Sequence, residues 1–348
     1  MTDKEIFAKL PDVLLPWYKD NARDLPWRQD QDPYHVWISE IMLQQTRVEA
    51  VKGYYQRFLQ TLPDIASLAN ADDELLHKLW EGLGYYSRVR NLKKAALQIM
   101  ETYQGQFPNE HDKVLKLPGI GLYTAGAICS ISFSLPTPAV DGNVLRVVAR
   151  LTNDDTPIDQ PSYQKSVRDA LAEIYPREAG AFTQALMELG ATVCGPNRKP
   201  QCEACPCEGF CKARKADAAQ LLPVKLPKKG RQREEMTVFI LSCQGDYALC
   251  KRPSTGLLAD LWEFPNVSGK LETEAALSVV EKMGLKPQEI IQQVERKHIF
   301  THIEWDMRGV YVEIKDKVAT YQWLSAEQIR SFAALPTAFR QFFELIPE

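Results

Sequence analysis

Two acidic residues stand inside stretches of the sequence that are otherwise apolar and helix-like. Glu40 lies in SEIMLQQT, within an apolar helical pattern, where burial would favour the neutral, protonated carboxyl group. A buried carboxylic acid of this kind can act as a general acid. Asp141 lies at the start of the apolar run DGNVLRVVARL, a place where an ordinary helix N-cap is the alternative interpretation.

A cluster of cysteines is the second feature able to do chemistry. Five of the eight cysteines fall in one short segment, with the spacing Cys194-x7-Cys202-x2-Cys205-x5-Cys211 and an additional Cys207. In a reducing compartment such a cluster indicates metal binding rather than disulfides. Four thiolates can converge on one centre at this spacing, which suits zinc or an iron–sulfur cluster. Cys207 could replace Cys205 or Cys211.

A glycine-containing turn lies between two helix-like stretches. The segment LPGIGLYTAGAI, residues 117–128, holds Gly119 and Gly121, where the lack of side chains would let backbone amides approach a phosphate. An ordinary helix hairpin with a glycine cap is the alternative. The complete pattern is similar to the helix-hairpin-helix DNA-binding motif.

The hydrophobic pattern separates two regions that must position these residues. From about residue 4 to residue 190, apolar residues recur at spacings of three and four, which predicts an all-α region. After a segment rich in Lys, Arg and Pro, the pattern predicts strands at 236–243, 246–252, 307–315 and 320–324, with helices near 273–283 and after 338. We therefore expect domains at 1–212 and 236–348, joined by a linker at 213–235.

Composition sets few limits on function. The 348 residues carry a net charge of −3, which by itself does not indicate nucleic-acid binding. A basic face on one domain would not show in that total. The chain has no apolar run of membrane-spanning length and no signal-peptide pattern at its start. We expect a cytoplasmic monomer with no membrane partner.

Residues 20–212 resemble the adenine DNA glycosylases of the MutY type, in the helix-hairpin-helix superfamily that includes endonuclease III. The remaining residues resemble that family's C-terminal domain, which has the Nudix fold of MutT-type hydrolases. The matching stretches, in the family's order, are LPWR, SEIMLQQTRV, WEGLGYYSRVRNL, LPGIG, VDGNVLRV and the cysteine cluster. The implied fold is multidomain: an all-α, two-lobed glycosylase domain with a [4Fe–4S] cluster, plus an α+β Nudix-like domain.

The resemblance assigns roles to the two acids. Glu40 would protonate a ring nitrogen of adenine, so that the base departs as a neutral molecule. Asp141 would stay ionised beside the oxocarbenium-like sugar, acting either electrostatically or as a covalent nucleophile. Tyr123 and Asn143 would support the reaction centre, although Tyr123 could be a half-buried hairpin tyrosine. Adenine opposite 8-oxoguanine or guanine in duplex DNA is the implied substrate.

The residue at position 123 separates two neighbouring families. Relatives similar to endonuclease III carry a lysine at this point of the hairpin, whose amine attacks the sugar and leads to strand cleavage. Tyrosine cannot form that imine, and Leu145 stands where some adenine glycosylases have a lysine. The sequence therefore predicts a monofunctional glycosylase. A bifunctional glycosylase–lyase and a non-catalytic lesion-binding protein are the alternatives.

The resemblance also implies binding residues. Gln45 and Tyr85 match family positions that wedge the duplex, with Leu83 beside them, and Phe300-Thr301-His302 matches a loop that reads 8-oxoguanine. A buried structural histidine is the alternative for His302. The full set of expected DNA contacts is Arg28, Gln44, Gln45, Thr46, Arg47, Leu83, Tyr85, Gly119, Gly121, Phe300, Thr301 and His302.

The cluster ligands implied are Cys194, Cys202, Cys205 and Cys211, although the family has six residues in the first gap where this chain has seven. The Nudix resemblance departs at the metal site. Where a hydrolase needs Arg-Glu followed by paired glutamates, this chain has Leu277-Ser278 and Glu281-Lys282, so pyrophosphate hydrolysis is not expected.

Overall fold

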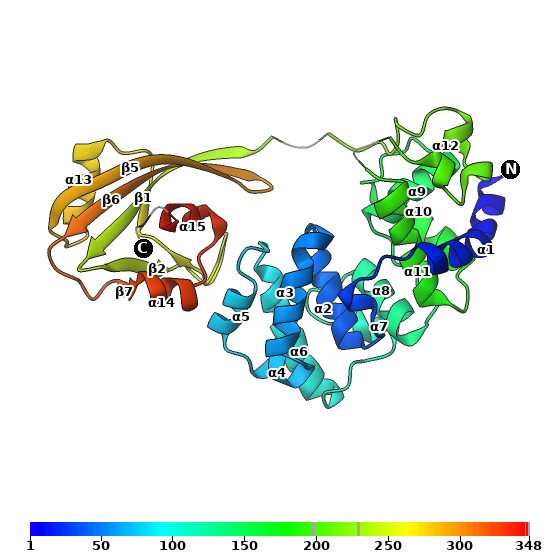
Figure 1. Cartoon of the computed structure of the whole chain (residues 1–348), viewed down its shortest axis with the longest axis horizontal. Helices are drawn as coiled ribbons and strands as arrows, with labels where there is room; N and C mark the ends of the chain where they lie inside the picture. Colours follow the sequence, from blue (N-terminus) through cyan, green and yellow to red (C-terminus); the bar gives the residue numbers. More distant parts are fainter. Residues whose placement is uncertain (197–198, 228–229, 345, 347–348) are drawn as a thin grey trace. The chain divides into compact units, whose positions relative to one another are not determined.

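A computed structural model describes residues 1–196, 199–227, 230–344 and 346. Contacts divide the chain into two compact units. The first comprises Met1–Asn70 with Asn91–Pro227, and the second comprises Ala71–Arg90 with Lys228–Glu348. The first consists of helices and the second is built around a sheet, as Figure 1 shows. Within the described residues, no helix is both long and apolar enough to span a bilayer.

The all-α fold predicted for residues 4–190 is confirmed. The helices from the N-terminus through the cluster loop are α1 (Asp3–Asn21), α2 (Pro33–Leu43), α3 (Val48–Thr61), α4 (Ile65–Asn70), α5 (Asp73–Leu79), α6 (Ser87–Tyr103), α7 (His111–Val114), α8 (Leu122–Phe133), α9 (Gly142–Thr152), α10 (Pro161–Ala172), α11 (Ala179–Glu188) and α12 (Lys212–Lys215). Single turns at Pro26–Arg28, Cys202–Ala204 and Glu208–Phe210 are 3₁₀ helices, and a π-helical turn at Leu189–Val193 extends α11.

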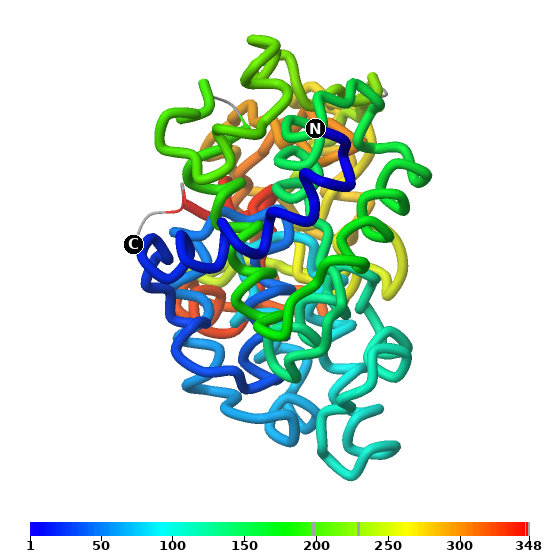
Figure 2. The backbone as a smooth tube through the Cα atoms, turned by 90° about the vertical axis from the view of Figure 1, so that its right-hand side faces the viewer, coloured from blue at the N-terminus to red at the C-terminus, as the bar shows by residue number. Residues whose placement is uncertain are grey.

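The first unit has two groups of helices. In one, α1 packs on α11 and shares an apolar core with α9 and α10, which includes Leu10, Leu14, Val148 and Phe182. Figure 1 shows α1 crossing these helices, and Figure 2 shows the start of the chain on the same group. In the other group α2 packs on α3 and α8, and α8 also packs on α11. The contact between α8 and α11 joins the two groups.

Part of the predicted linker, residues 213–235, packs against the first unit. Residues up to Pro227 belong to that unit by their contacts. Arg150 Nε donates to the Leu222 carbonyl at 3.0 Å, and the Ile158 amide donates to the Val224 carbonyl at 3.1 Å. These bonds hold the segment that follows α12 against α9 and the loop after it.

The second unit contains a mixed sheet. Its strands are β1 (Gln232–Cys243), β2 (Asp246–Lys251), β3 (Trp262–Glu263), β4 (Asn266–Ser268), β5 (Pro287–Ile299), β6 (Ile303–Ile314) and β7 (Gln322–Ser325). The described strands follow the order β3-β2-β1-β6-β5, with β4 on β1 and β7 on β2. β1 and β6 are parallel, whereas β5 and β6 form a long antiparallel hairpin.

Helices cover both faces of this sheet, which explains the continuous apolar run of β1. Val238 and Ile240 face a core completed by α15 (Thr337–Phe343) and α14 (Ala326–Ser331). Phe239 and Leu241 face the opposite core, which contains α13 (Thr273–Lys282). Because side chains alternate along a strand, a strand buried on both sides needs apolar residues at every position. The predicted α+β fold is confirmed.

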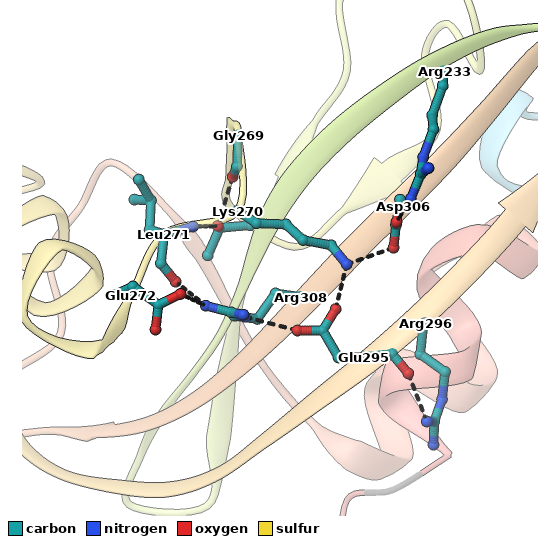
Figure 3. Close-up of polar contacts among 10 residues, drawn as sticks. Arg233, Gly269, Lys270, Leu271, Glu272, Glu295, Arg296, Asp306 and Arg308 are labelled. Carbon is teal, nitrogen blue, oxygen red and sulfur yellow. Dashed lines mark hydrogen bonds and ion pairs between the residues drawn. The ribbon is translucent and has the colours of Figure 1, made fainter.

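A polar network fixes the loop before α13 to the sheet (Figure 3). Lys270 Nζ lies 2.5 Å from carboxylate oxygens of Glu295 and Asp306. Arg308 donates to Glu272 at 2.9 Å and to Glu295 at 2.8 Å, and Arg233 pairs with Asp306. Ammonium and guanidinium groups thus balance each of these carboxylates, including the buried Asp306.

We predict that Gly126→Ala destabilises the first unit although alanine is the better helix former. A Cβ at Gly126 would lie 2.3 Å from the Pro138 carbonyl oxygen, so α8 would have to move away from the segment that leads to Asp141. We expect a loss of about 1–3 kcal/mol in the free energy of unfolding, measured by urea denaturation.

Gly53→Ala is the matched control, because the nearest atom to its added Cβ is the end of the flexible Arg57 side chain at 3.3 Å. This variant should gain about 0.4–1 kcal/mol. Equal stability of the two variants would contradict the packing interpretation.

Candidate active site

The two acids singled out in the sequence line one cavity of about 640 Å³ in the first unit. Glu40 comes from α2, Tyr123 from α8, and Asp141 from the residue that begins α9. The end of α11 closes another wall with Glu188. Four elements from distant parts of the sequence therefore meet at this cavity.

Glu40 is buried, as the apolar pattern around it predicts. Only 6% of the residue is exposed, and the Tyr123 hydroxyl donates to its Oε2 at 2.5 Å. Burial raises the pKa of Glu40 to about 7, against the opposing effect of the Tyr123 hydrogen bond, and the charge of Asp141 raises it further. Glu40 can therefore hold a proton near neutral pH.

Asp141 is held by donors that favour its charged form. As the N-cap of α9, its Oδ1 accepts the Val144 amide at 2.8 Å, and its Oδ2 accepts Asn143 Nδ2 at 2.7 Å. Burial raises the pKa of Asp141, while these hydrogen bonds and the Arg146 charge oppose that shift. Asp141 accepts hydrogen bonds from two donors and Glu40 from one, so Asp141 is the better candidate for the ionised member of the pair. The N-cap interpretation is therefore correct without excluding a role in the cavity.

The amide of Asn143 is fixed from behind. Arg146 Nη2 donates to Asn143 Oδ1 at 2.8 Å and to the Gly190 carbonyl at 2.7 Å, while Arg146 Nε donates to the Cys194 carbonyl at 2.8 Å. A Cβ at Gly190 would lie 2.6 Å from the Asn143 Cβ. Neither Arg146 nor Gly190 was predicted as a site residue, because neither residue type signals chemistry on its own.

Arg28, expected as a DNA contact, lines the cavity and pairs with Glu188 at 2.8 Å. Arg23 donates to the same carboxylate at 2.6 Å. Burial alone would raise the pKa of Glu188, but these hydrogen bonds hold it below its usual value. Glu188 was missed because it sits in an ordinary helical pattern, and its only signal is an acid in the apolar run ALMELG.

The expected hairpin is present. The turn between α7 and α8 contains Gly119, whose φ of +77° lies in the left-handed region and whose missing Cβ would meet Asn91 at 2.7 Å. Gly121 is the N-cap of α8, with open space where its Cβ would lie. The amides at the start of α8 thus belong to a turn that a phosphate can approach closely.

The α2–α3 loop contains the next group of expected DNA contacts. Gln44 lies in the cavity wall, 3.4 Å from Thr124 Oγ1, and Thr46 also lines the cavity. Gln45 is exposed and has a φ of 58°, while the exposed Arg47 begins α3. Gln44, Gln45 and Thr46 therefore line the same cavity as the two acids, whereas Arg47 does not border it.

The other expected contacts lie in the second unit. Tyr85 is 47% exposed, whereas Leu83 beside it is 7% exposed and does not present its side chain to solvent. The Tyr85 hydroxyl lies 2.5 Å from Thr301 Oγ1. His302 is exposed, so the alternative of a buried histidine is wrong, and Phe300 packs edge-on against Trp305.

Four cysteines border one small apolar pocket in the first unit. Its walls include Cys194, Cys202, Cys205 and Cys211. Arg150, which the sequence analysis missed, donates from Nη1 to Cys194 Sγ at 3.1 Å. Cys207 is buried next to Cys205, and the two side chains form a hydrogen bond. The four expected ligands thus face a common space.

Comparisons with known proteins show to which families the two parts of the chain are similar. Residues 38–176 match the HhH-GPD superfamily of base excision DNA repair proteins, and residues 236–345 match the NUDIX domain. A thermostable thymine-DNA glycosylase covers 62% of this chain and 97% of its own at 27% identity, with a TM-score of 0.54. A trapped endonuclease III–DNA intermediate also covers 62% of this chain, with 25% identity and a TM-score of 0.52.

Relatives with known activity extend the similarity through both units. The human adenine DNA glycosylase is 34% identical over 95% of this chain and 73% of its own length. The enzyme of the same name from Buchnera aphidicola subsp. Acyrthosiphon pisum is 34% identical over 89% of this chain and 87% of its own. The protein described here therefore belongs to the adenine DNA glycosylase family, whose members are base excision repair enzymes.

Proposed function

We propose that this enzyme hydrolyses the N-glycosidic bond of adenine mispaired with 8-oxoguanine or guanine, without cutting the strand. The observation that carries the proposal is the pairing of Glu40 and Asp141 in one cavity with different hydrogen-bond partners. A protonated acid and an ionised carboxylate are the two groups that glycosidic cleavage requires.

Glu40 protonates a ring nitrogen of the flipped adenine, so that the base leaves as a neutral molecule. Tyr123, hydrogen-bonded to Oε2, keeps the carboxyl group oriented toward the base. Once the base has left, the Glu40 carboxylate can accept a proton from the attacking water. Asp141 stabilises the positive charge that develops on the sugar, and Asn143 and Arg146 hold Asp141 in place.

The absence of a lyase step follows from the same residues. A lyase needs a lysine amine that attacks the sugar carbon. The hairpin position is occupied by Tyr123, and Leu145 is buried in the first turns of α9. Neither side chain can form an imine, which supports a monofunctional enzyme.

Residues of the second unit are suited to read the base opposite the adenine. Tyr85, Thr301 and His302 are exposed, and the first two are hydrogen-bonded to each other. A flat tyrosine ring can fill a vacated position in the base stack, while the hydroxyl and imidazole can distinguish 8-oxoguanine from guanine by hydrogen bonding. We propose that Phe300 supports this loop by packing on Trp305.

We further propose that Cys194, Cys202, Cys205 and Cys211 hold a [4Fe–4S] cluster. All four thiols border one pocket, so they can converge on one group. Membership of the HhH-GPD superfamily favours an iron–sulfur cluster, which would cross-link the loop after α11.

Replacing either acid with its amide tests the proposed chemistry. Glu40→Gln removes the proton donor and Asp141→Asn removes the negative charge, so each should slow single-turnover adenine release by about 10²–10⁴-fold on duplex with A opposite 8-oxoguanine. Release is measured as strand cleavage after alkali. Glu49→Gln, an exposed acid on α3, is the matched control and should react like the parent enzyme.

Adenine release by both amide variants at the parent rate would overturn the proposal. Strand cleavage before alkali, with trapping of enzyme on DNA by borohydride, would refute its monofunctional part.

The rate of adenine release should depend on pH through Glu40. The acid is active when protonated, so the rate should fall as the pH rises through about 7. Tyr123 donates a hydrogen bond that lowers the pKa of Glu40. Tyr123→Phe should therefore move the fall in rate to higher pH. Single-turnover rates between pH 5 and 9 would measure the shift. A fall in rate at the same pH in both enzymes would contradict this assignment.

Cysteine substitutions test the cluster. Cys202→Ala and Cys205→Ala should remove a ligand and lower the iron content and brown colour of the purified protein. Cys207→Ala is the matched control, because Cys207 does not border the pocket, and it should keep its iron. Iron loss in the Cys207 variant alone, or zinc in a colourless parent enzyme, would contradict the proposal.

A further inference from the structure

The segment Ala71–Arg90 belongs by its contacts to the second unit, although the sequence on both sides of it belongs to the first. It contains α5, the loop with Tyr85, and the first turn of α6. The proposed reading of the opposite base uses Tyr85 from this segment and Thr301 from the β5–β6 hairpin. What holds the segment against the sheet therefore bears on specificity.

Glu74 on α5 makes one half of this attachment. Its Oε2 accepts the Trp262 indole N–H at 2.9 Å, and its Oε1 pairs with Lys251. Lys251 and Trp262 are neighbours in register on β2 and β3, and the Lys251 ammonium lies 5.2 Å from the centre of the Trp262 ring. The Glu74 side chain is 22% exposed, so its ion pair with Lys251 and its hydrogen bond from Trp262 are partly shielded from water.

The end of α5 makes the other half. Glu81 Oε1 accepts the Leu335 amide at 3.0 Å, and its Oε2 lies 2.7 Å from Lys78 Nζ. Lys78 in turn donates to the Ala333 carbonyl at 3.3 Å. Arg90 Nη1 donates to the Ala259 carbonyl at 2.8 Å. Side chains from the middle and the C-terminal end of the segment therefore bind backbone groups of the sheet unit.

The loop between these attachments has a defined shape. Gly82, Gly84 and Tyr85 all have φ in the left-handed region. Trp80 Nε1 donates to the Gly84 carbonyl at 3.1 Å, and Arg88 Nη2 donates to the carbonyls of Leu83 and Gly84. Because the loop is tied to α5 and α6 in this way, a shift of α5 would displace Tyr85 from Thr301.

We propose that Glu74 and Glu81 are positioning residues for base selection: they hold the Tyr85 loop and the Thr301 loop as one reading surface. This inference rests on the proposed function, in which the second unit reads the base opposite the adenine. Neither carboxylate lies in the cavity with Glu40, so their loss should leave the chemical step intact. The quantity they control is the preference for A opposite 8-oxoguanine over A opposite guanine.

A charge exchange tests the Glu74 half in the full-length enzyme. Glu74→Lys and Lys251→Glu each place like charges together, and each should lower the preference ratio of kcat/KM by about tenfold, as expected for one charged hydrogen bond. The double variant restores opposite charges with a carboxylate beside Trp262 and should recover most of the ratio. Glu101→Lys, an exposed reversal on α6, is the charge control.

The Glu81 half is tested by Glu81→Gln and Glu81→Ala. The amide keeps an acceptor for the Leu335 N–H and should lose less selectivity than alanine. In both, single-turnover release from A opposite guanine at saturating enzyme should stay near the parent rate. Hydrogen exchange of the amides in 82–88 should accelerate in the alanine variant, which a purely catalytic role would not cause.

Failures of the two proposals are separable. If Thr301→Val with His302→Ala leaves the preference unchanged, the second unit does not read the opposite base. If that variant lowers the preference while Glu74→Lys and Glu81→Ala do not, only the positioning inference is wrong. Equal losses on both substrates, or no recovery in the charge exchange, would also overturn it.

Discussion

Two carboxyl groups line one cavity, and burial makes the charged form of each less favourable. Much of the first unit follows from this constraint. Asp141 receives an amide and a side-chain donor from its own helix, whereas Glu40 receives a single hydroxyl in an apolar helix. Burial raises the pKa of both groups, and the additional donors and the Arg146 charge oppose this rise at Asp141, which favours a proton on Glu40 and a charge on Asp141.

Such a pair depends on close approach between elements that are distant in the sequence. Gly126 lets α8 lie against the Pro138 carbonyl, and Gly190 lets the turn after α11 lie against Asn143. The buried Glu188 is charged because Arg23 and Arg28 neutralise it, so it adds no third proton-binding group beside the pair. Close packing at the two glycines and the ion pairs of Glu188 therefore both shape the surroundings of the two acids.

The sequence predicted the parts of this arrangement that have a local signal. Apolar periodicity predicted the helices. Glu40 and Asp141 stood out as acids in apolar runs, and the resemblance to the glycosylase family gave them their expected roles. Strand β5 was not predicted, because it lies at the sheet edge and carries charged or polar residues at most positions. Glu188 and Arg146 were missed because their importance comes from partners more than forty residues away. The grouping of Ala71–Arg90 with the second unit has no local signal either.

Because Ala71–Arg90 groups with the second unit, the residues proposed for recognition and those proposed for chemistry belong to different units. Adenine is a normal base, and an acid with a pKa near neutrality would protonate any adenine that reaches it. Selection must therefore act earlier, when extrusion costs a few kcal/mol and contacts with the opposite base can offset that cost. The reading surface proposed above would be assembled from two chain segments, so it could be altered without disturbing the buried acids. Selectivity and rate then depend on different residues, and each can change while the other is preserved.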